Sequence, residues 1–237
     1  MERYKVISDI HGSYDEFEEL LQVAGYNPDQ DQLVLLGDYI DRGPKSCEVV
    51  ARVMELVQAY GAIALGGNHE DIFLGWLDGL ERMTKIFAND HTGGGATLRS
   101  YCAGHGDWEK EDQAKAVLQE FFSDHIAFLR ALPDYHETEH HVFVHAGINP
   151  FAEDWKQSTR AELRWIREPF HKNPHPHAQT FVFGHTPTGH LHGNETCHDI
   201  WHGEKIIGID GGCAYGHQLN CLEISEGDYH VYTVRKR

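Results

Sequence analysis

The sequence contains no long hydrophobic run, no paired cysteine motif and no internal repeat. None of its apolar stretches approaches the ~20 residues that a membrane-spanning helix requires, so we do not expect a membrane partner. The five cysteines are odd in number and form no C-x-x-C pair, which argues against a disulfide framework. The first predicted strand begins near residue 4 and runs to Asp9, leaving no room for a cleavable signal peptide. These absences predict a cytoplasmic protein.

Positive charge is also scarce, because 20 Lys and Arg residues stand against 37 Asp and Glu residues, for a formal net charge of −17. Proteins that bind nucleic acid usually present an excess of basic residues, so nucleic acid is not expected as a partner. A phosphorylated substrate remains compatible with this charge, since bound divalent cations and one or two arginines create a local positive focus. The sequence contains no signal for an oligomeric state.

The hydrophobic pattern predicts a single α/β domain over residues 1–237. With 41% hydrophobic residues the chain can bury a sizeable core, and no linker is evident. Apolar residues recur at helical spacing over 13–25 and 47–60, between runs typical of buried strands. The resulting order of strand, helix, strand, helix, strand is typical of α/β proteins.

Residues 71–132 lose the strand pattern and carry helical patterns at 114–122 and 125–132, on either side of the glycines at 93–95. We interpret this region as a helical insertion that walls an active-site cleft and sets substrate selectivity, and the glycines as a flexible joint. Strand patterns return after it, and the runs at 205–209, 219–224 and 229–234 predict successive antiparallel strands.

Polar side chains follow five apolar runs of the chain, at 5–7, 32–36, 62–65, 142–144 and 180–183. The metal-ligating types among them are Asp9, His11, Asp38, Asn68, His145 and His185. Strands that lie side by side deliver the residues after their carboxyl ends to one edge of a sheet. Two carboxylates, an amide oxygen and three imidazoles suit manganese, iron or zinc, whereas calcium takes mostly oxygen ligands.

The five clusters of polar residues that follow these apolar runs, taken in this order, resemble the metallophosphoesterase superfamily. The resemblance is specifically to its PPP branch of serine/threonine protein phosphatases. The second cluster carries the branch signature with Asp38, Asp41 and Arg42 in one loop. Trp-Ile-Arg-Glu at 165–168 and Ile-Asp-Gly-Gly at 209–212 are similar to small bacterial protein phosphatases. Bacterial diadenosine tetraphosphate hydrolases share the same core. The resemblance implies the calcineurin-like fold, with two mixed β-sheets in a sandwich flanked by α-helices.

The resemblance also implies the roles of the site residues. One divalent ion is expected on Asp9, His11 and Asp38, and a second on Asp38, Asn68, His145 and His185, with manganese expected and iron or zinc as alternatives. Such a pair lowers the pKa of a bridging water and presents hydroxide to phosphorus.

Four further residues complete the predicted site. His69 is expected to protonate the departing oxygen as a general acid, with Asp41 orienting its imidazole. Arg42 is expected to clamp phosphate oxygens through its planar fork. The similarity at 165–168 selects Arg167 as the second clamp, with Arg164 as the alternative.

The sequence therefore predicts a dimetal-dependent phosphomonoesterase of the bacterial protein-serine/threonine phosphatase type, acting on a phosphoprotein or phosphopeptide. The alternative enzyme is a hydrolase of diadenosine tetraphosphate or of another small phosphoester, with the same metals behind a different cleft. An alternative from another class is an inactive scaffold that binds phosphorylated partners, although the complete ligand set argues against it.

Four other features of the sequence bear on this interpretation. The run at 136–140 matches the H-E-x-x-H pattern of zinc proteases, but it leads directly into the strand at 142–144, which leaves little room for the required helix. The histidine-rich region at 171–202 is expected at the surface. Gly66 stands where many PPP enzymes have an arginine, and the segment at 210–218, with Tyr215, also departs from the eukaryotic pattern.

Overall fold

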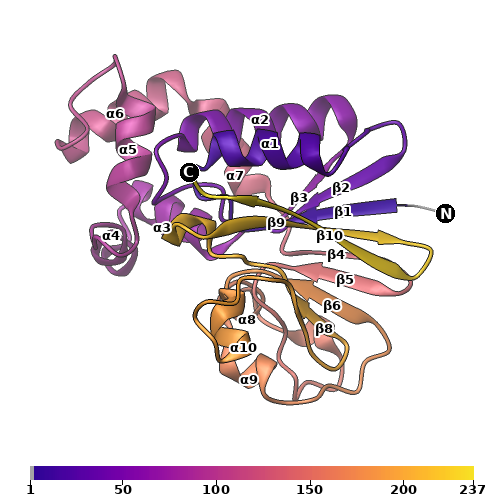
Figure 1. Ribbon diagram of the computed structural model, residues 1–237. Coiled ribbons are helices and arrows are strands. Elements are labelled where there is room, and N and C mark those ends of the chain that lie inside the picture. Colours follow the sequence, from indigo (N-terminus) through magenta and orange to yellow (C-terminus); the bar gives the residue numbers. More distant parts are fainter. Residues whose placement is uncertain (1–2) are drawn as a thin grey trace.

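The computed structural model describes residues 3–237, which form two facing five-stranded β-sheets (Figure 1). The strand order is β10-β9-β1-β2-β3 in the first sheet and β4-β5-β6-β8-β7 in the second. The first sheet contains β1 Arg3–Ile7, β2 Asp31–Leu35, β3 Ile63–Ala64, β9 Gln218–Ser225 and β10 Asp228–Arg235, and the second contains β4 Tyr135–Glu137, β5 His141–Val144, β6 Thr180–Phe183, β7 Trp201–His202 and β8 Ile206–Gly208. The expected sandwich of two mixed sheets is confirmed.

Each sheet combines three neighbouring parallel strands with two strands in antiparallel pairs. Strands β1, β2 and β3 run parallel, with β9 antiparallel to β1 and β10 antiparallel to β9. In the second sheet β5, β6 and β8 run parallel, while β4 and β7 pair antiparallel at the edges. The parallel strands of each sheet therefore end on the same side, where their following loops gather.

Alternation along the strands divides their apolar side chains between two cores. Val6 and Val34 lie in a core between the sheets with Phe143 and Val182 of the second sheet. Their neighbours, such as Ile7, lie in the core beneath the helices of the outer face. Because successive side chains of a strand point to opposite faces, a strand covered on both faces has to be apolar throughout. This explains the uninterrupted apolar runs in the sequence.

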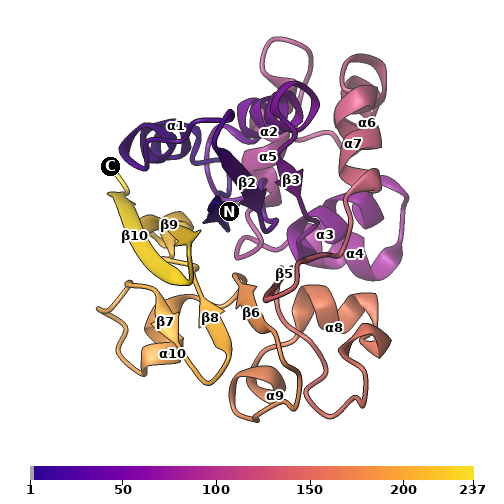
Figure 2. The ribbon, with the colours of Figure 1, turned by 90° about the vertical axis from the view of Figure 1, so that its right-hand side faces the viewer.

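Helices cover the outer face of both sheets (Figure 2). Helices α1, Tyr14–Val23, and α2, Ser46–Tyr60, pack on the first sheet and agree with the expected helices at 13–25 and 47–60. Gly61 ends α2 in the left-handed conformation at φ +69°. Below the second sheet lie the short helices α8, Arg160–Trp165, α9, Glu168–His171, and α10, Thr188–His192.

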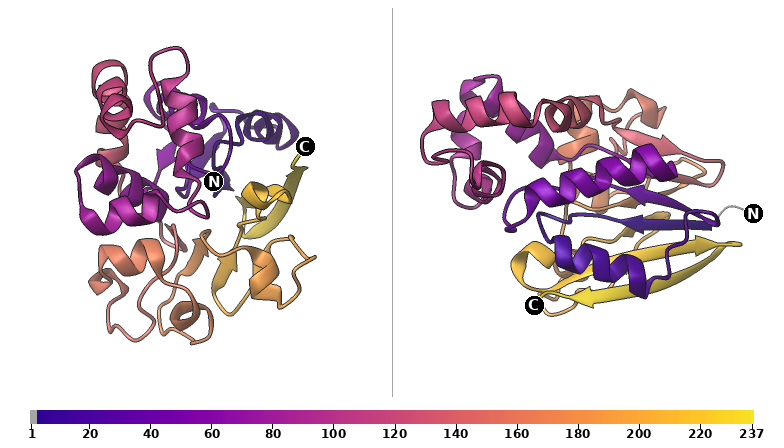
Figure 3. Two further views of the ribbon diagram at one scale, coloured as in Figure 1. Left: turned by 90° about the vertical axis from the view of Figure 1, so that its left-hand side faces the viewer. Right: turned by 90° about the horizontal axis from the view of Figure 1, so that it is seen from above.

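The expected helical insertion is present at one end of the molecule (Figure 3). Its helices are α3 Asn68–Leu77, α4 Glu81–Phe87, α5 Gly94–Cys102, α6 Glu111–Phe121 and α7 Ser123–Ala131. It begins at Asn68, three residues before the predicted start. Of the glycines at 93–95, expected as a flexible joint, Gly93 caps α5 and the other two lie in its first turn, and the Gly93 carbonyl accepts a hydrogen bond from the Arg42 N–H at 3.1 Å.

Two expectations about strand pairing were wrong. The five strands that precede the polar clusters do not share one sheet, since β1, β2 and β3 belong to the first and β5 and β6 to the second. The run at 205–209 does not pair with the run at 219–224 either, because β8 pairs with β6 and β7 whereas β9 pairs with β1 and β10. The segment around Gly211 and Gly212 crosses between sheets, and a two-glycine turn signal does not distinguish this crossing from a hairpin.

Candidate metal centre

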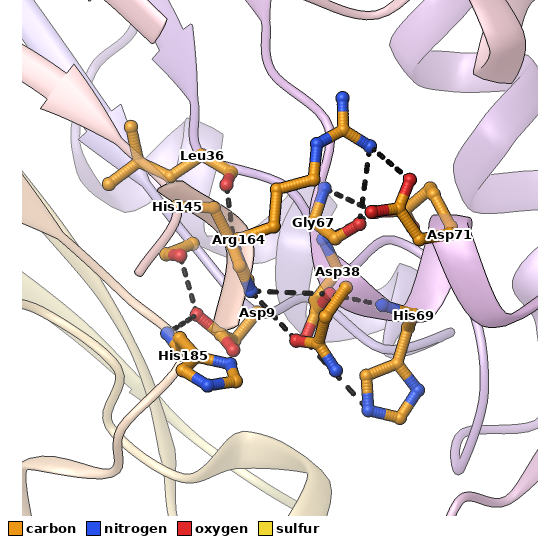
Figure 4. A network of polar contacts seen from close by, with 12 residues as sticks. Asp9, Leu36, Asp38, Gly67, His69, Asp71, His145, Arg164 and His185 are labelled. Carbon is orange, nitrogen blue, oxygen red and sulfur yellow. Dashed lines mark hydrogen bonds and ion pairs between the residues drawn. The ribbon is translucent and has the colours of Figure 1, made fainter. Parts of the chain in front are cut away.

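The loops after β1, β2, β3, β5 and β6 meet around the carboxylate of Asp38 (Figure 4). Its Oδ2 lies 3.4 Å from Nε2 of His11 and 3.9 Å from Nε2 of His69, and its Oδ1 lies 3.4 Å from Nε2 of His145. Asp38 and these three histidines are all buried. One carboxylate is therefore shared by imidazoles from three loops and both sheets.

Two groups of side chains have metal-binding spacing among residues 3–237. One consists of His11, Asp38 and His69, and the other of Asp38, His145 and His185, with the candidate ligand atoms of each group within 4.8 Å of one another. Both groups are buried and both contain Asp38. The pair fits a binuclear metal site in which Asp38 is common to the two ions.

Asp9 and Asn68, the two remaining predicted ligands, lie at the edges of these groups. Oδ1 of Asp9 is 4.0 Å from Nε2 of His11, while its Oδ2 accepts hydrogen bonds from Ser8 and from the His185 N–H. Oδ1 of Asn68 lies 3.0 Å from Nε2 of His145. The structure thus brings all six predicted ligands to one place.

The histidine rings are held so that one nitrogen of each faces the centre. Nδ1 of His11 lies 2.7 Å from the Ile40 carbonyl, and Nδ1 of His145 lies 2.9 Å from the Leu36 carbonyl. A carbonyl can only accept, so each Nδ1 carries the proton and leaves the Nε2 lone pair available for a metal. Nε2 of His185 is buried without a hydrogen-bond partner, which also suits a metal ligand.

Backbone strain is concentrated in the same loops. Asp9, His11, Asp38 and His185 have φ angles of +54°, +46°, +56° and +64°, in the left-handed region that non-glycine residues seldom adopt. Each such residue costs about 1–3 kcal/mol and persists where the surroundings require it. The strain places four of the predicted ligands and therefore points to a functional requirement at this site.

Two glycines allow the loops to approach this closely. A Cβ on Gly67 would lie 2.2 Å from Oδ1 of Asp38, and one on Gly184 would lie 2.2 Å from Oδ2 of Asp9. Real Cβ atoms do not occupy such positions, so a side chain at either residue would displace a predicted ligand.

Burial and neighbouring charges shift the pKa values of the acids and histidines at the centre. Burial, followed by the charge of Asp210, raises the pKa of Asp9 to about 8. Burial also acts to raise the pKa of Asp38, but His145, His69 and His11 outweigh it and hold the pKa well below its usual value. Burial lowers the pKa of His11 and His185, which favours the neutral rings that metals bind. Divalent cations would balance the buried carboxylates.

His69 makes a second set of contacts, to the loop after β2. Its Nδ1 lies 2.7 Å from Oδ2 of Asp41, whose side chain is fully buried. Thr97 of α5 fixes Asp41 in turn. The Thr97 hydroxyl donates a hydrogen bond to Oδ1 of Asp41, and the Asp41 N–H donates to the Thr97 hydroxyl oxygen at 2.8 Å. Burial acts to lower the pKa of His69, but Asp38 and Asp41 outweigh it and raise the pKa.

The three arginines considered from sequence have different surroundings. Arg42 reaches the centre, with its Nη1 2.5 Å from Nε2 of His11. Arg167 is exposed beside the centre and donates a hydrogen bond to the Thr186 hydroxyl at 3.1 Å. Arg164 is completely buried and points away from the ligands (Figure 4). It forms ion pairs with Asp71 at 2.8 Å and with Asp134 at 2.7 Å, so its charge is already neutralised.

Comparison with known proteins gives the family. The family model described as calcineurin-like phosphoesterase matches residues 3–221.

The chain belongs to the calcineurin-like phosphoesterase family.

The ligand set and the family together make it a metal-dependent phosphoesterase. The chain is 26% identical over 245 residues to an asymmetrical bis(5′-nucleosyl)-tetraphosphatase of Oceanobacillus iheyensis, covering 94% of this chain and 89% of that one. It is 33% identical over 145 residues to a symmetrical bis(5′-nucleosyl)-tetraphosphatase of Aromatoleum aromaticum. This second match covers 61% of the chain and 44% of the relative, so the chain spans less than half of that protein's length.

Solved structures agree on the fold. A crystal structure of a proposed diadenosine tetraphosphatase superposes with a TM-score of 0.69 at 21% identity, covering 100% of this chain and 94% of the other. A serine/threonine phosphatase of Saccharomyces cerevisiae superposes with a TM-score of 0.62 at 15% identity, covering 100% of this chain and 80% of the other. At such identities the likeness concerns the calcineurin-like fold alone.

The competing motifs take no part in this phosphoesterase's metal centre. Residues 135–137 form strand β4, so the H-E-x-x-H run is not helical and cannot present its two histidines on one helix face. Within the described chain, neither group with metal-binding spacing includes a histidine of the histidine-rich region other than the predicted ligand His185. No helix among residues 3–237 is both long and apolar enough to cross a membrane.

Gly66 has a structural explanation in the calcineurin-like fold of this chain. The position of a Cβ on Gly66 lies 2.2 Å from a guanidinium nitrogen of Arg164. Gly66 therefore makes room for an arginine that arrives from another element, α8. The departure from the PPP pattern at this position accompanies the burial of Arg164.

Two acids of the site had no role in the sequence interpretation. Glu70 accepts hydrogen bonds from the N–H groups of Asp38, Tyr39 and Gly67 at 2.8–2.9 Å and thereby fixes the loop that carries the shared carboxylate. Asp210 is buried close to Asp9 and Arg42, and burial raises its pKa to about 6. It follows the apolar run of β8 directly, the same pattern that identified the other clusters, so the signal was present in the sequence.

Proposed function

We propose that this chain hydrolyses bis(5′-nucleosyl) tetraphosphates asymmetrically, releasing a nucleoside triphosphate and a nucleoside monophosphate. The observation that carries the proposal is the similarity to asymmetrical tetraphosphatases along 94% of the chain, including 28% identity to that of Bacillus subtilis. The symmetrical enzymes match over 61% of the chain. This similarity favours the alternative that the sequence left open over protein-serine/threonine phosphatase activity.

In this proposal the six predicted ligands hold two divalent ions. Asp9, His11 and Asp38 hold one, and Asp38 holds the other together with the residues Asn68, His145 and His185. When bound, the ions polarise phosphoryl oxygens and provide hydroxide at neutral pH.

The remaining residues act on the phosphate chain and on the departing group. Arg42 and Arg167 bind non-bridging phosphoryl oxygens, a role that the exposed Arg167 can take and that the ion pairs of Arg164 prevent. His69 donates a proton to the oxygen that leaves as the P–O bond breaks. Asp41 is a positioning residue that fixes the imidazole from the side opposite the centre.

The nature of the leaving group offers a test of this proposal. A nucleotide leaves as a phosphate oxygen, which is a better leaving group than a seryl or threonyl alkoxide and needs less help from a general acid. His69 should therefore matter less for a tetraphosphate than for a phosphothreonine peptide.

The experiment compares manganese-loaded protein on diadenosine tetraphosphate and on a phosphothreonine peptide, with His69→Asn alongside. We expect faster turnover of the dinucleotide, with ATP and AMP as the products resolved by anion-exchange chromatography. Two ADP molecules would assign symmetrical cleavage. Faster, His69-dependent turnover of the peptide would restore the protein phosphatase, and no turnover of either substrate would favour the binding scaffold.

A further inference from the structure

A cavity of about 810 Å³ lies beside the metal centre, between the helical insertion and the loop after β2. Its volume is within the range typical of small-molecule sites, about 300–1,000 Å³. The insertion contributes residues from α3 to the start of α6, and the catalytic side contributes Arg42 and Tyr215. None of the predicted metal ligands lines this space, so it is separate from the centre although it adjoins it.

Arg42 joins the cavity to the centre. Its guanidinium Nη1 lies 2.5 Å from Nε2 of His11, and its Cζ lies 5.0 Å from the ring centroid of Tyr215 on the cavity wall. Its backbone N–H donates to Gly93 of the insertion. A phosphate held by Arg42 therefore has the metal ligands on one side and the cavity on the other.

The far part of the cavity offers an aromatic surface. Trp108 is half-buried, and the Arg99 guanidinium stacks over its ring at 4.8 Å. Trp76 and Phe87 also line the cavity, where they are buried and stack at 4.6 Å. Gly95 of α5 lies beside the Trp108 ring and adds no side chain to the space, since the position of its Cβ is 3.5 Å from the indole.

The charges of the wall indicate what kind of group would fit. Asp90, Glu109 and Glu111 line the cavity together with His91, whereas its arginines are Arg42, beside the metal centre, and Arg99, which is stacked on the indole. Carboxylates repel further phosphates but accept hydrogen bonds from exocyclic amines. An uncharged heterocycle with an amino group fits this part of the cavity, with its phosphates towards Arg42.

We propose that this cavity binds a nucleoside of the substrate, with its base stacked on Trp108. The inference rests on the proposed function, because it gives the nucleotide portion of the tetraphosphate a place to bind. Stacking of a base on an aromatic side chain contributes enough to change affinity by about tenfold or more. The insertion would then supply the selectivity for nucleotides over phosphopeptides.

The test separates the base from the phosphate. With p-nitrophenyl phosphate as the assay substrate of manganese-loaded protein, the inhibition constants of AMP and of ribose 5-phosphate are measured. We expect AMP to inhibit about tenfold more strongly than ribose 5-phosphate, which has the same phosphate and sugar but no base. In Trp108→Ala this ratio should fall towards one.

Two comparisons guard against misfolding. Tyr229→Ala removes a partly exposed aromatic residue from a different cavity, also lined by Tyr4 and His141, and should keep the ratio. Gly95→Leu is compared with Gly95→Ala: both replace a helix glycine with a better helix former, but only leucine fills the space beside Trp108. The leucine variant should lose the preference for AMP relative to the alanine variant.

Equal inhibition by AMP and ribose 5-phosphate in the unaltered protein would overturn the inference. A ratio that survives both Trp108→Ala and Gly95→Leu would overturn it as well. Turnover of diadenosine tetraphosphate is measured separately. A preference for AMP without that turnover would reject the tetraphosphatase activity and keep the nucleoside site. Turnover without a preference for AMP would keep the tetraphosphatase activity and reject the nucleoside site.

Discussion

The loops of the metal centre and the histidine-rich segment use the same residue type in opposite surroundings. We define this segment as His171, His175, His177, His190, His192, His198 and His202. At the centre, His11 and His145 each fix one ring nitrogen on a carbonyl and direct the other towards Asp38. In the segment, ring nitrogens of His171, His175 and His177 are buried without partners, and no shared carboxylate lies among them.

This contrast teaches that the shared central acid distinguishes the predicted metal ligands from the other histidines, because a ring such as that of His192 also has a carbonyl partner, 3.1 Å from its Nε2. The histidines of the segment instead pack on aromatic residues, as His171 does on Phe183 with ring centroids 5.1 Å apart. The number of histidines in a stretch of sequence is therefore a poor guide to metal binding in this chain.

Removing the central acid should have the largest effect. In Asp38→Asn the charge shared by His11, His69 and His145 is lost, so the centre comes to resemble the histidine-rich segment. Loss of a partner behind a ligand costs about 10–100-fold in metal affinity or activity, so loss of the shared acid should cost more than about a hundredfold in kcat. Metal content, measured by elemental analysis after dialysis, should fall with activity.

The matched control is Asp107→Asn, which removes an exposed acid of the insertion. Full metal content and normal turnover in Asp38→Asn would contradict the assignment of the centre and revive the inactive scaffold, since catalysis would then not depend on Asp38.

Arg164 and Arg167 lie three residues apart and show a second contrast, because Arg164 is buried in ion pairs whereas Arg167 is exposed. Arg164 is buried between Asp71 and Asp134, and breaking a buried ion pair from one side costs about 3–5 kcal/mol. Arg164→Met should therefore lower the free energy of unfolding by about 3 kcal/mol, measured by urea denaturation. Arg167→Met should leave that free energy nearly unchanged and raise KM by about tenfold, since it removes a charged hydrogen bond to phosphate.

A loss of stability in Arg167→Met, or a raised KM with normal stability in Arg164→Met, would exchange the two assignments. The helical and charged pattern of this stretch did not separate these residues, and only the similarity at 165–168 selected Arg167. What separates them is the missing side chain of Gly66, which creates the space for one guanidinium.

The gathering of the predicted ligands at one centre could be foreseen from the sequence, because each cluster follows an apolar run and the order of the clusters resembles that of the family. Asp210 follows the same rule after β8 and was given no role, so the pattern was sufficient but was not applied fully. The division of the strands between two sheets was not predictable from periodicity. Val6 and Val142 both lie in uninterrupted apolar runs, and such a run shows that both faces of a strand are covered, not which sheet it joins.

Asp41→Asn should lower kcat less than Asp38→Asn does. The variant keeps a side chain of the same shape but removes the charge that holds the His69 imidazole at 2.7 Å. We expect kcat to fall by about 10–100-fold, within the range of general acid catalysis. The fall should be larger for phenyl phosphate than for p-nitrophenyl phosphate, because the poorer leaving group depends more on protonation. Equal losses on the two esters would instead assign Asp41 to the support of the loop.

The smallest predicted effect concerns His171 and the histidine-rich segment. Burial, followed by the charge of Arg167, lowers the pKa of His171 to about 4, whereas the nearby Glu168 acts in the opposite direction. The ring contacts Phe170 of its own helix α9 and Phe183 of β6, and its Nε2 has no hydrogen-bond partner.

Because the folded pKa of His171 lies below the ordinary value of about 6.5, the unfolded chain binds the proton more readily. The contribution of the neutral ring to stability is thus present above pH 6.5 and is lost as the pH falls towards 4. His171→Phe keeps the aromatic packing and removes the titration, so its stability relative to the unaltered protein should rise between pH 7 and pH 5. The partial exposure of the ring reduces the expected gain to about 1 kcal/mol. Urea denaturation at both pH values measures it, and a difference that is independent of pH would show that the ring is already solvated.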